Sequence, residues 1–130
     1  MAKSSVGYKY QSITNIYVVL TDSYQDVATG AADDSDVFVL TVTNDDASIG
    51  TLTIAVSDGV DIKIEQVEVL ANAGFANSVP AVELIKDEVI PGLTSDEHGN
   101  FFFRLKAGRK LRMKRDNNSS LVVIGHQMNF

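Results

Sequence analysis

Cysteine and tryptophan are absent from this 130-residue sequence, and proline and histidine occur twice each. Without cysteine the chain has no disulfide framework, no thiolate metal site and no thiol nucleophile, so its fold must rest on packing. No apolar run approaches the roughly eighteen residues that cross a bilayer. Residues 1–5 also lack the apolar stretch of a signal peptide. We therefore expect a protein that is made in a cytoplasm and does not contact a membrane.

The motifs of catalysis and cofactor binding are missing as well. No phosphate-binding glycine loop, Gly-x-Ser-x-Gly turn or His-Glu-x-x-His helix occurs. His98 and His126 are isolated, without a second ligand at metal-binding spacing. Residues 33–36 and 58–61 offer carboxylates, but neither segment has the spaced ligands and closing glutamate of a calcium loop. These absences predict a protein that is not an enzyme and that holds no metal or cofactor.

The residues that are present favour β-sheet. Hydrophobic residues make up 45% of the chain, and Val, Ile, Thr, Phe and Tyr are prominent. Residues 37–43 and 51–56 alternate with the period of two that is typical of strands. In the first segment this alternation places Phe38, Leu40 and Val42 on one face. We predict that the two segments are consecutive strands of a meander.

Similar patterns extend the prediction to about seven or eight short strands separated by polar turns. In residues 61–70 the alternation changes phase, which predicts a bulge at residues 65–66. The pattern as a whole predicts one domain, residues 1–130, with an antiparallel β-sandwich or jelly-roll-like barrel. Residues 1–11 are a candidate arm that holds a neighbouring subunit, and a frayed terminus is the alternative. The remaining predicted strands are residues 16–21, 101–106, 110–114 and 121–124.

One segment, residues 78–92, has the pattern of a short helix. Its serine and early proline suit the first helical turn. Val82, Ile85 and Val89 follow at helical spacing before a Pro-Gly pair ends the run. We predict a helix of roughly ten residues here, and an extended segment is the alternative.

Charge is distributed unevenly along the chain. The net charge is −6, but residues 1–100 contain four basic and sixteen acidic residues, whereas residues 101–130 contain seven basic residues and one acidic residue. A chain that is basic at one end can attract an acidic partner or copies of itself. We therefore expect a homo-oligomer or an acidic partner.

The basic residues fall on two predicted strands that flank Gly108. A hairpin with a three-residue loop would place Leu105 opposite Leu111 and so bury a clean apolar face. The other face would then align like charges, which destabilise a ladder by up to about 1 kcal/mol per pair. That face and its turn supply the candidate partner-binding residues Phe102, Arg104, Lys106, Arg109, Lys110, Arg112 and Lys114.

An acidic surface is predicted to cover this cationic face. The candidates are the chain's own segments 33–36 and 44–46, a neighbouring subunit, or nucleic acid. The sequence argues against nucleic acid, because the chain is acidic overall and lacks a binding motif. The simpler alternative is that the long side chains extend into solvent. We hypothesise that the face packs on an acidic surface of another subunit.

Several stretches resemble one family of proteins. Residues 20–30 (LTDSYQDVATG) and the strand at residues 38–44 resemble the opening of many small β-rich virion proteins of tailed bacteriophages. Residues 91–108 and the last strand, residues 121–125, are similar as well. The resemblance implies a β-sandwich that is made in the host cytoplasm and built into the virion. Arg109 departs from the family, which often has an acidic residue after the Ala-Gly turn.

The resemblance implies a structural function without turnover. Most such proteins are capsid decoration or cement proteins, which bind the major capsid protein or other virion subunits and stabilise the shell. The first alternative is a tail or head-to-tail connector subunit, which would form rings through edge-strand pairing. The second is a module that binds carbohydrate or a receptor, although the chain lacks the tryptophan that such sites often expose.

Overall fold

The computed structural model describes residues 10–76, 78–86 and 89–130. These residues form strands and no helix, and every strand pair is antiparallel. The prediction of a mainly β, antiparallel protein is therefore confirmed. The strands are β1 (Ser12–Val19), β2 (Gln25–Thr29), β3 (Ser35–Asn44), β4 (Gly50–Ser57), β5 (Asp61–Val69), β6 (Val82–Glu83), β7 (Thr94–Ser95), β8 (Phe101–Leu105), β9 (Lys110–Arg115) and β10 (Leu121–Asn129).

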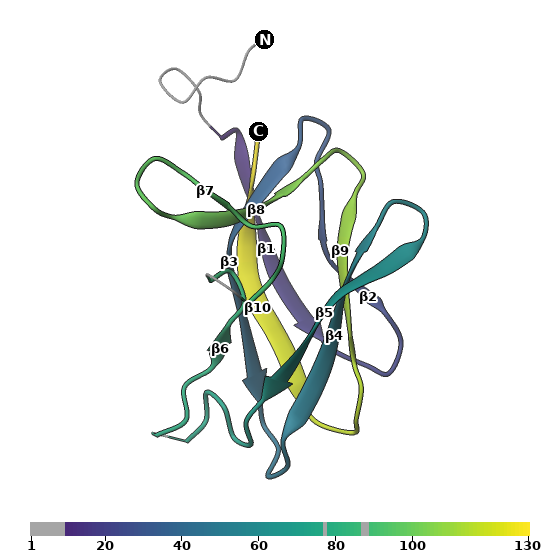
Figure 1. Ribbon diagram of the computed structural model, residues 1–130, viewed down its shortest axis with the longest axis vertical. Coiled ribbons are helices and arrows are strands. Elements are labelled where there is room, and N and C mark those ends of the chain that lie inside the picture. The colour runs from purple at the N-terminus through teal and green to yellow at the C-terminus, as the bar shows by residue number, and fades with distance from the viewer. Residues whose placement is uncertain (1–9, 77, 87–88) are drawn as a thin grey trace.

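Two sheets pack face to face (Figure 1). The first sheet has the order β1-β10-β3-β8-β7, and the short strand β6 pairs with β3 beside β8. The second sheet has the order β2-β9-β4-β5. Within the described residues, only β4–β5 and β7–β8 are neighbours both along the chain and in a sheet. Most connections therefore cross from one sheet to the other.

The two hairpins predicted from the sequence are wrong. β3 and β4 lie in different sheets, so residues 37–43 and 51–56 form no meander. β8 pairs with β3 and β7, whereas β9 pairs with β2 and β4. Leu105 and Leu111 are nevertheless both fully buried in the shared core. The alternating pattern identified the side chains that point inward, but it carries no information on which strand pairs with which.

The predicted helix is also wrong in the residues that the structure describes. Val82–Glu83 forms β6, which pairs with β3, and the Leu84 N–H donates a 2.8 Å hydrogen bond to the Leu40 carbonyl. Residues 87–88 lie outside the description. Leu84, outside the predicted helical stripe, is fully buried, while Ile85 is only partly buried. Packing against β3 therefore outweighed the helical pattern.

A bulge in each of two strands changes which of its residues point toward the core. In β3, Phe38 has no partner between Val39 and Val37, which pair with His126 and Gln127. Val37 is therefore buried in the core, and the prediction that Phe38 shares a face with Leu40 is wrong. In β5, the unmatched residue is Ile64, one position before the predicted bulge.

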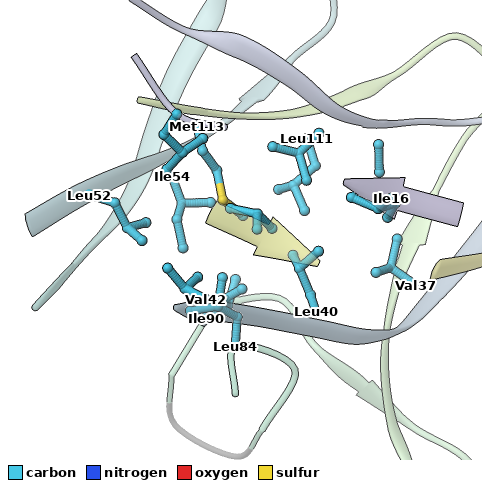
Figure 2. Packing of buried hydrophobic residues seen from close by; sticks show 14 of the residues in the cluster. Ile16, Val37, Leu40, Val42, Leu52, Ile54, Leu84, Ile90, Leu111 and Met113 are labelled. Atoms are coloured by element: carbon cyan, nitrogen blue, oxygen red, sulfur yellow. The ribbon is translucent and has the colours of Figure 1, made fainter. Parts of the chain in front are cut away.

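The hydrophobic core fills the space between the sheets (Figure 2). Leu111, Met113 and Ile54 of the second sheet point toward Leu40 and Val42 of the first. All five side chains are almost completely buried. Burial of each such side chain contributes about 1.5–3 kcal/mol, so this shared core holds the two sheets together.

Hydrogen-bonded polar side chains close one end of the core. Ser35 Oγ donates to Asn129 Oδ1 at 2.7 Å, and Gln127 Nε2 donates to the same oxygen at 2.9 Å. Gln127 Nε2 also donates to the Thr29 carbonyl at 2.8 Å, and Asn129 Nδ2 donates to Thr14 Oγ1 at 2.8 Å. The network satisfies buried amides and ties β1 and β3 to the C-terminal strand.

Candidate functional site

The outer side of the first sheet exposes no charged side chain over most of three adjacent strands. Ile16, Leu40 and Val123 point into the core, so the alternate residues of β1, β3 and β10 point outward. The one charged residue at these outward positions is Asp36, at the β8 end of β3, and it is almost completely buried and paired with Arg104. We call this surface the apolar face, and it consists of Ile13, Asn15, Tyr17, Val19, Val39, Thr41, Thr43, Val122, Ile124, His126 and Met128.

The apolar face is continuous because its residues lie opposite one another across the strands. Tyr17 of β1 lies opposite Ile124 of β10, which lies opposite Thr41 of β3. Side chains in such rows are about 4.5–5.5 Å apart at their Cβ atoms. The rows on either side are Val19-Val122-Thr43 and Asn15-His126-Val39.

Large hydrophobic side chains on this face are exposed to solvent. Ile13, Tyr17, Val19, Val39 and Ile124 are each between 43% and 70% exposed. Scattered apolar residues on a surface are normal, but a contiguous patch marks an interaction site. A hollow borders the patch between the segments of β3 that pair with β6 and with β8, and it is lined in part by Val39, Thr41 and Ile85. The apolar face is therefore the candidate functional site.

At the β8 end of the first sheet, aromatic rings enclose an ion pair. Arg104 binds Asp36 through two nitrogens, with Nη2 donating at 3.1 Å to Oδ2, and the Tyr10 hydroxyl donates to the same oxygen at 3.0 Å. The guanidinium lies over the rings of Phe130 and Phe102, at 4.8 and 5.4 Å from their centroids. The hydrogen bond to Asp36 raises the pKa of Arg104, against the opposing effect of burial. Arg104 is thus paired with the chain's own acidic segment 33–36.

The outer side of the second sheet is charged. Asp26 lies 2.9 Å from both Lys110 Nζ and Arg112 Nε, and Arg112 Nη1 lies 2.9 Å from Asp61. The Lys114 ammonium lies over the ring of Tyr24, 5.2 Å from its centroid. We call the outward side chains Asp26, Lys110, Arg112, Lys114 and Asp61 the charged face.

The seven predicted partner-binding residues do not share one surface. Three belong to the charged face, while Phe102 and Arg104 belong to the aromatic cluster on the other sheet. Lys106 is exposed in the turn between β8 and β9, and Arg109 Nη2 lies 3.8 Å from Asp58 Oδ2. The predicted cationic ladder therefore does not form, and a partner-binding role for these residues stays a prediction.

Reasoning from the sequence missed the apolar face. The signal was present, because neither β1 nor β10 contains a single Asp, Glu, Lys or Arg. A strand that is half covered by a core normally carries charges on its solvent side. Two such strands, 102 positions apart from the end of β1 to the start of β10, had to be placed side by side before the patch could be seen.

Comparisons with known proteins leave the family open. No family model, no curated protein and no solved structure matches the chain. In the described part of the chain, no helix has the length and apolar character needed to cross a membrane. Among the same residues, no group of three or more His, Cys, Asp or Glu side chains is arranged to hold a metal ion.

Proposed function

We propose that the chain is a non-enzymatic structural subunit of a virion, a β-sandwich decoration protein that binds the outer surface of a capsid shell. The observation that carries the proposal is the apolar face. An exposed, contiguous and uncharged surface of this kind favours association, because covering it removes apolar area from water. The charged face on the opposite sheet would then remain in solvent.

The binding mechanism follows from the side chains of the apolar face. Burial of apolar surface contributes about 25 cal/mol per Å², and association itself opposes binding by several kcal/mol. A single copy with five large exposed side chains would therefore bind weakly. Many copies on one particle stabilise the shell together, because each adds contacts between neighbouring shell subunits.

Two basic side chains in the turn between β8 and β9 favour a shell surface that also carries acidic groups. Lys106 is exposed, and the 3.8 Å separation of Arg109 from Asp58 makes a weak ion pair. These two members of the predicted cationic set remain open to an acidic group on a partner. Contacts of this type steer association and depend on salt more than they add affinity.

The location of the chain in purified particles tests the proposal. Particles of the virus that encodes the chain would be banded by density, and the chain should be found in the particle band and be accessible to antibody on its outside. Absence from the particles, or a position inside the shell, would contradict the proposal.

Binding of purified chain to capsid shells from which it has been removed tests whether the apolar face makes the contact. Val39→Lys places a charge on the apolar face at a half-exposed position of β3, away from the β1 edge. We expect this variant to bind at least tenfold more weakly, because a charge would be buried in an apolar contact. Ile62→Lys on β5 is the matched control and should bind like the natural chain. Equal binding by both variants would exclude the apolar face as the contact.

A further inference from the structure

One edge strand, β1, is open in the described structure. β1 pairs with β10 along its whole length and has no strand partner on its other side among the described residues. The Leu20 N–H donates to the Leu121 carbonyl at 2.9 Å, which sets the alternation of the antiparallel ladder. By that alternation, the backbone N–H and C=O groups of Ile13, Asn15, Tyr17 and Val19 point away from β10. β1 therefore presents a row of open donors and acceptors about 26 Å long.

The other edges carry features that oppose pairing, and β1 carries none. β5 contains Asp61, Lys63, Glu65 and Glu68 within nine residues and is interrupted by a bulge. β2 has five residues and a register shift, and β6 and β7 have two residues each. Charges, bulges and short length are the devices that keep sheet edges from pairing. β1 has eight residues, no charge, no proline and no register shift against β10.

We propose that β1 pairs antiparallel with β1 of a second copy of this chain, across a two-fold axis. With the axis at Ile16, Ile13 lies opposite Val19 of the second copy and Asn15 lies opposite Tyr17. No register of this pairing brings like charges together, because β1 has none. A self-pairing of β5 centred on its middle residue would instead oppose two copies of Glu65. An isologous contact of this kind closes after two copies.

The pairing joins the two apolar faces into one. The strand order across the dimer would be β3-β10-β1-β1-β10-β3, and the outward side chains of all six strands would lie on one side. β1 contributes none of the charges that give each chain its net −6, so charge repulsion at the strand contact itself is weak. The proposal does not depend on the virion function, because it concerns the purified chain alone.

The area of contact predicts a reversible dimer. A single strand edge is much narrower than the roughly 800 Å² per partner of a standard interface. We therefore expect dissociation constants on the order of micromolar or weaker. Light scattering after gel filtration, from about 1 µM to about 1 mM, should show the mass rising from 14.1 kDa toward twice that value.

Two variants test whether β1 makes the contact. Asn15→Pro removes one open N–H on the side away from β10, a position that an edge strand tolerates. Tyr17→Lys keeps the backbone and adds a charge at a position that is 70% exposed. Each should weaken self-association at least tenfold. Ile62→Lys, at a 65% exposed position of the other edge, should dimerise like the natural chain.

Cross-linking tests the geometry, because the chain has no cysteine of its own. In the proposed register, two Asn15→Cys residues are diagonal neighbours, about 7–8 Å apart. A short bis-maleimide should therefore join them, and it should not join two Ile62→Cys chains. A monomer at every concentration, a closed ring of more than two copies, or a dimer that survives Tyr17→Lys would overturn the proposal. Circular dichroism shows whether each variant is folded. If Asn15→Pro does not fold, the result for Tyr17→Lys alone decides whether β1 makes the contact.

Discussion

The two sheets share one core but differ on their outer sides. On the charged face, the cations of β9 lie against acidic groups or a tyrosine ring, and the neighbouring edge β5 carries four charged residues. On the apolar face, three adjacent strands expose no charged side chain, since Asp36 of β3 is buried and paired with Arg104, and the edge β1 is uncharged. The chain thus has one side that is suited to water and one that is suited to contact.

The same comparison explains the uneven charge along the sequence. The basic last thirty residues and the acidic first hundred look bipolar, yet the fold brings them together in ion pairs. Arg104 reaches Asp36, 68 positions away, and Lys110 reaches Asp26, 84 positions away. The basic end of the sequence is therefore neutralised by ion pairs on both sheets. The contrast in space lies between the charged face of the second sheet and the apolar face of the first.

The largest expected effect concerns the strand that builds the apolar face. A Cβ at Gly125 of β10 would lie 2.0 Å from the Val39 carbonyl oxygen, which is backbone and cannot move aside. We expect Gly125→Ala to lower the free energy of unfolding by about 3 kcal/mol or more, at the upper end of overpacking losses. It should also separate β3 from β10 and so disrupt the apolar face.

Gly50 of the second sheet is the matched control. A Cβ there would meet the Leu121 Cδ2 and Ser119 Oγ atoms at 2.7 and 2.8 Å, and both are side-chain atoms that can shift. Gly50→Ala should therefore lower the unfolding free energy by only about 1 kcal/mol. Urea denaturation of both variants makes the comparison, and equal losses would show that backbone contact at Gly125 is not what fixes the register.

A smaller change in the free energy of unfolding is expected when one ion pair from each sheet is removed. Arg104 and Lys110 are equally exposed at 42%, but their partners differ, since Asp36 is 1% exposed and Asp26 is 47% exposed. Arg104→Met leaves a buried carboxylate without its cation and should lower the unfolding free energy by about 2–3 kcal/mol. Lys110→Met should lower it by less than about 1 kcal/mol.

The two substitutions should also differ in how their effect on stability depends on salt concentration. Raising the salt concentration should reduce the effect of Lys110→Met, because both partners are half exposed and screened by solvent. The effect of Arg104→Met should persist, because Asp36 is shielded from solvent. Similar losses for both variants, with the same salt dependence, would contradict the distinction between the two sheets.

The sequence predicted where strands form better than how they pair. Alternation identified the segments of β3, β4, β5, β8 and β9, because an inward side chain every second residue is a local requirement. Which strands pair with each other depends on the whole fold. Nothing in the local sequence therefore indicates that β3 and β4 belong to different sheets. The same holds for the segment around Leu84, whose burial against β3 is decided by contacts far away in sequence.

The candidate site was predictable only in part. The basic residues near the C-terminus were visible, but their acidic partners lie 51 to 93 positions away, so the sequence could not show that the charges are compensated. The apolar face needed the pairing of β1 with β10. It could have been anticipated only by asking why two predicted strands lack charge on the side that should face water.

The smallest expected effect concerns a carboxylate that belongs to neither face. Asp96 accepts hydrogen bonds from the backbone N–H groups of His98 and Asn100, and the bond from Asn100 is the main cause that lowers the pKa of Asp96 below its usual 3.8. Because the folded pKa is lowered, this contribution is present above pH 3.8 and is lost as the pH falls through the lowered value. Amide NMR signals of His98 and Asn100 should therefore shift with a midpoint below 3.8, and Asp96→Asn should abolish the shift. A midpoint at or above 3.8 would show that the turn does not favour the charged form of Asp96, and the charge of Asp96 would then contribute nothing to the structure of this turn.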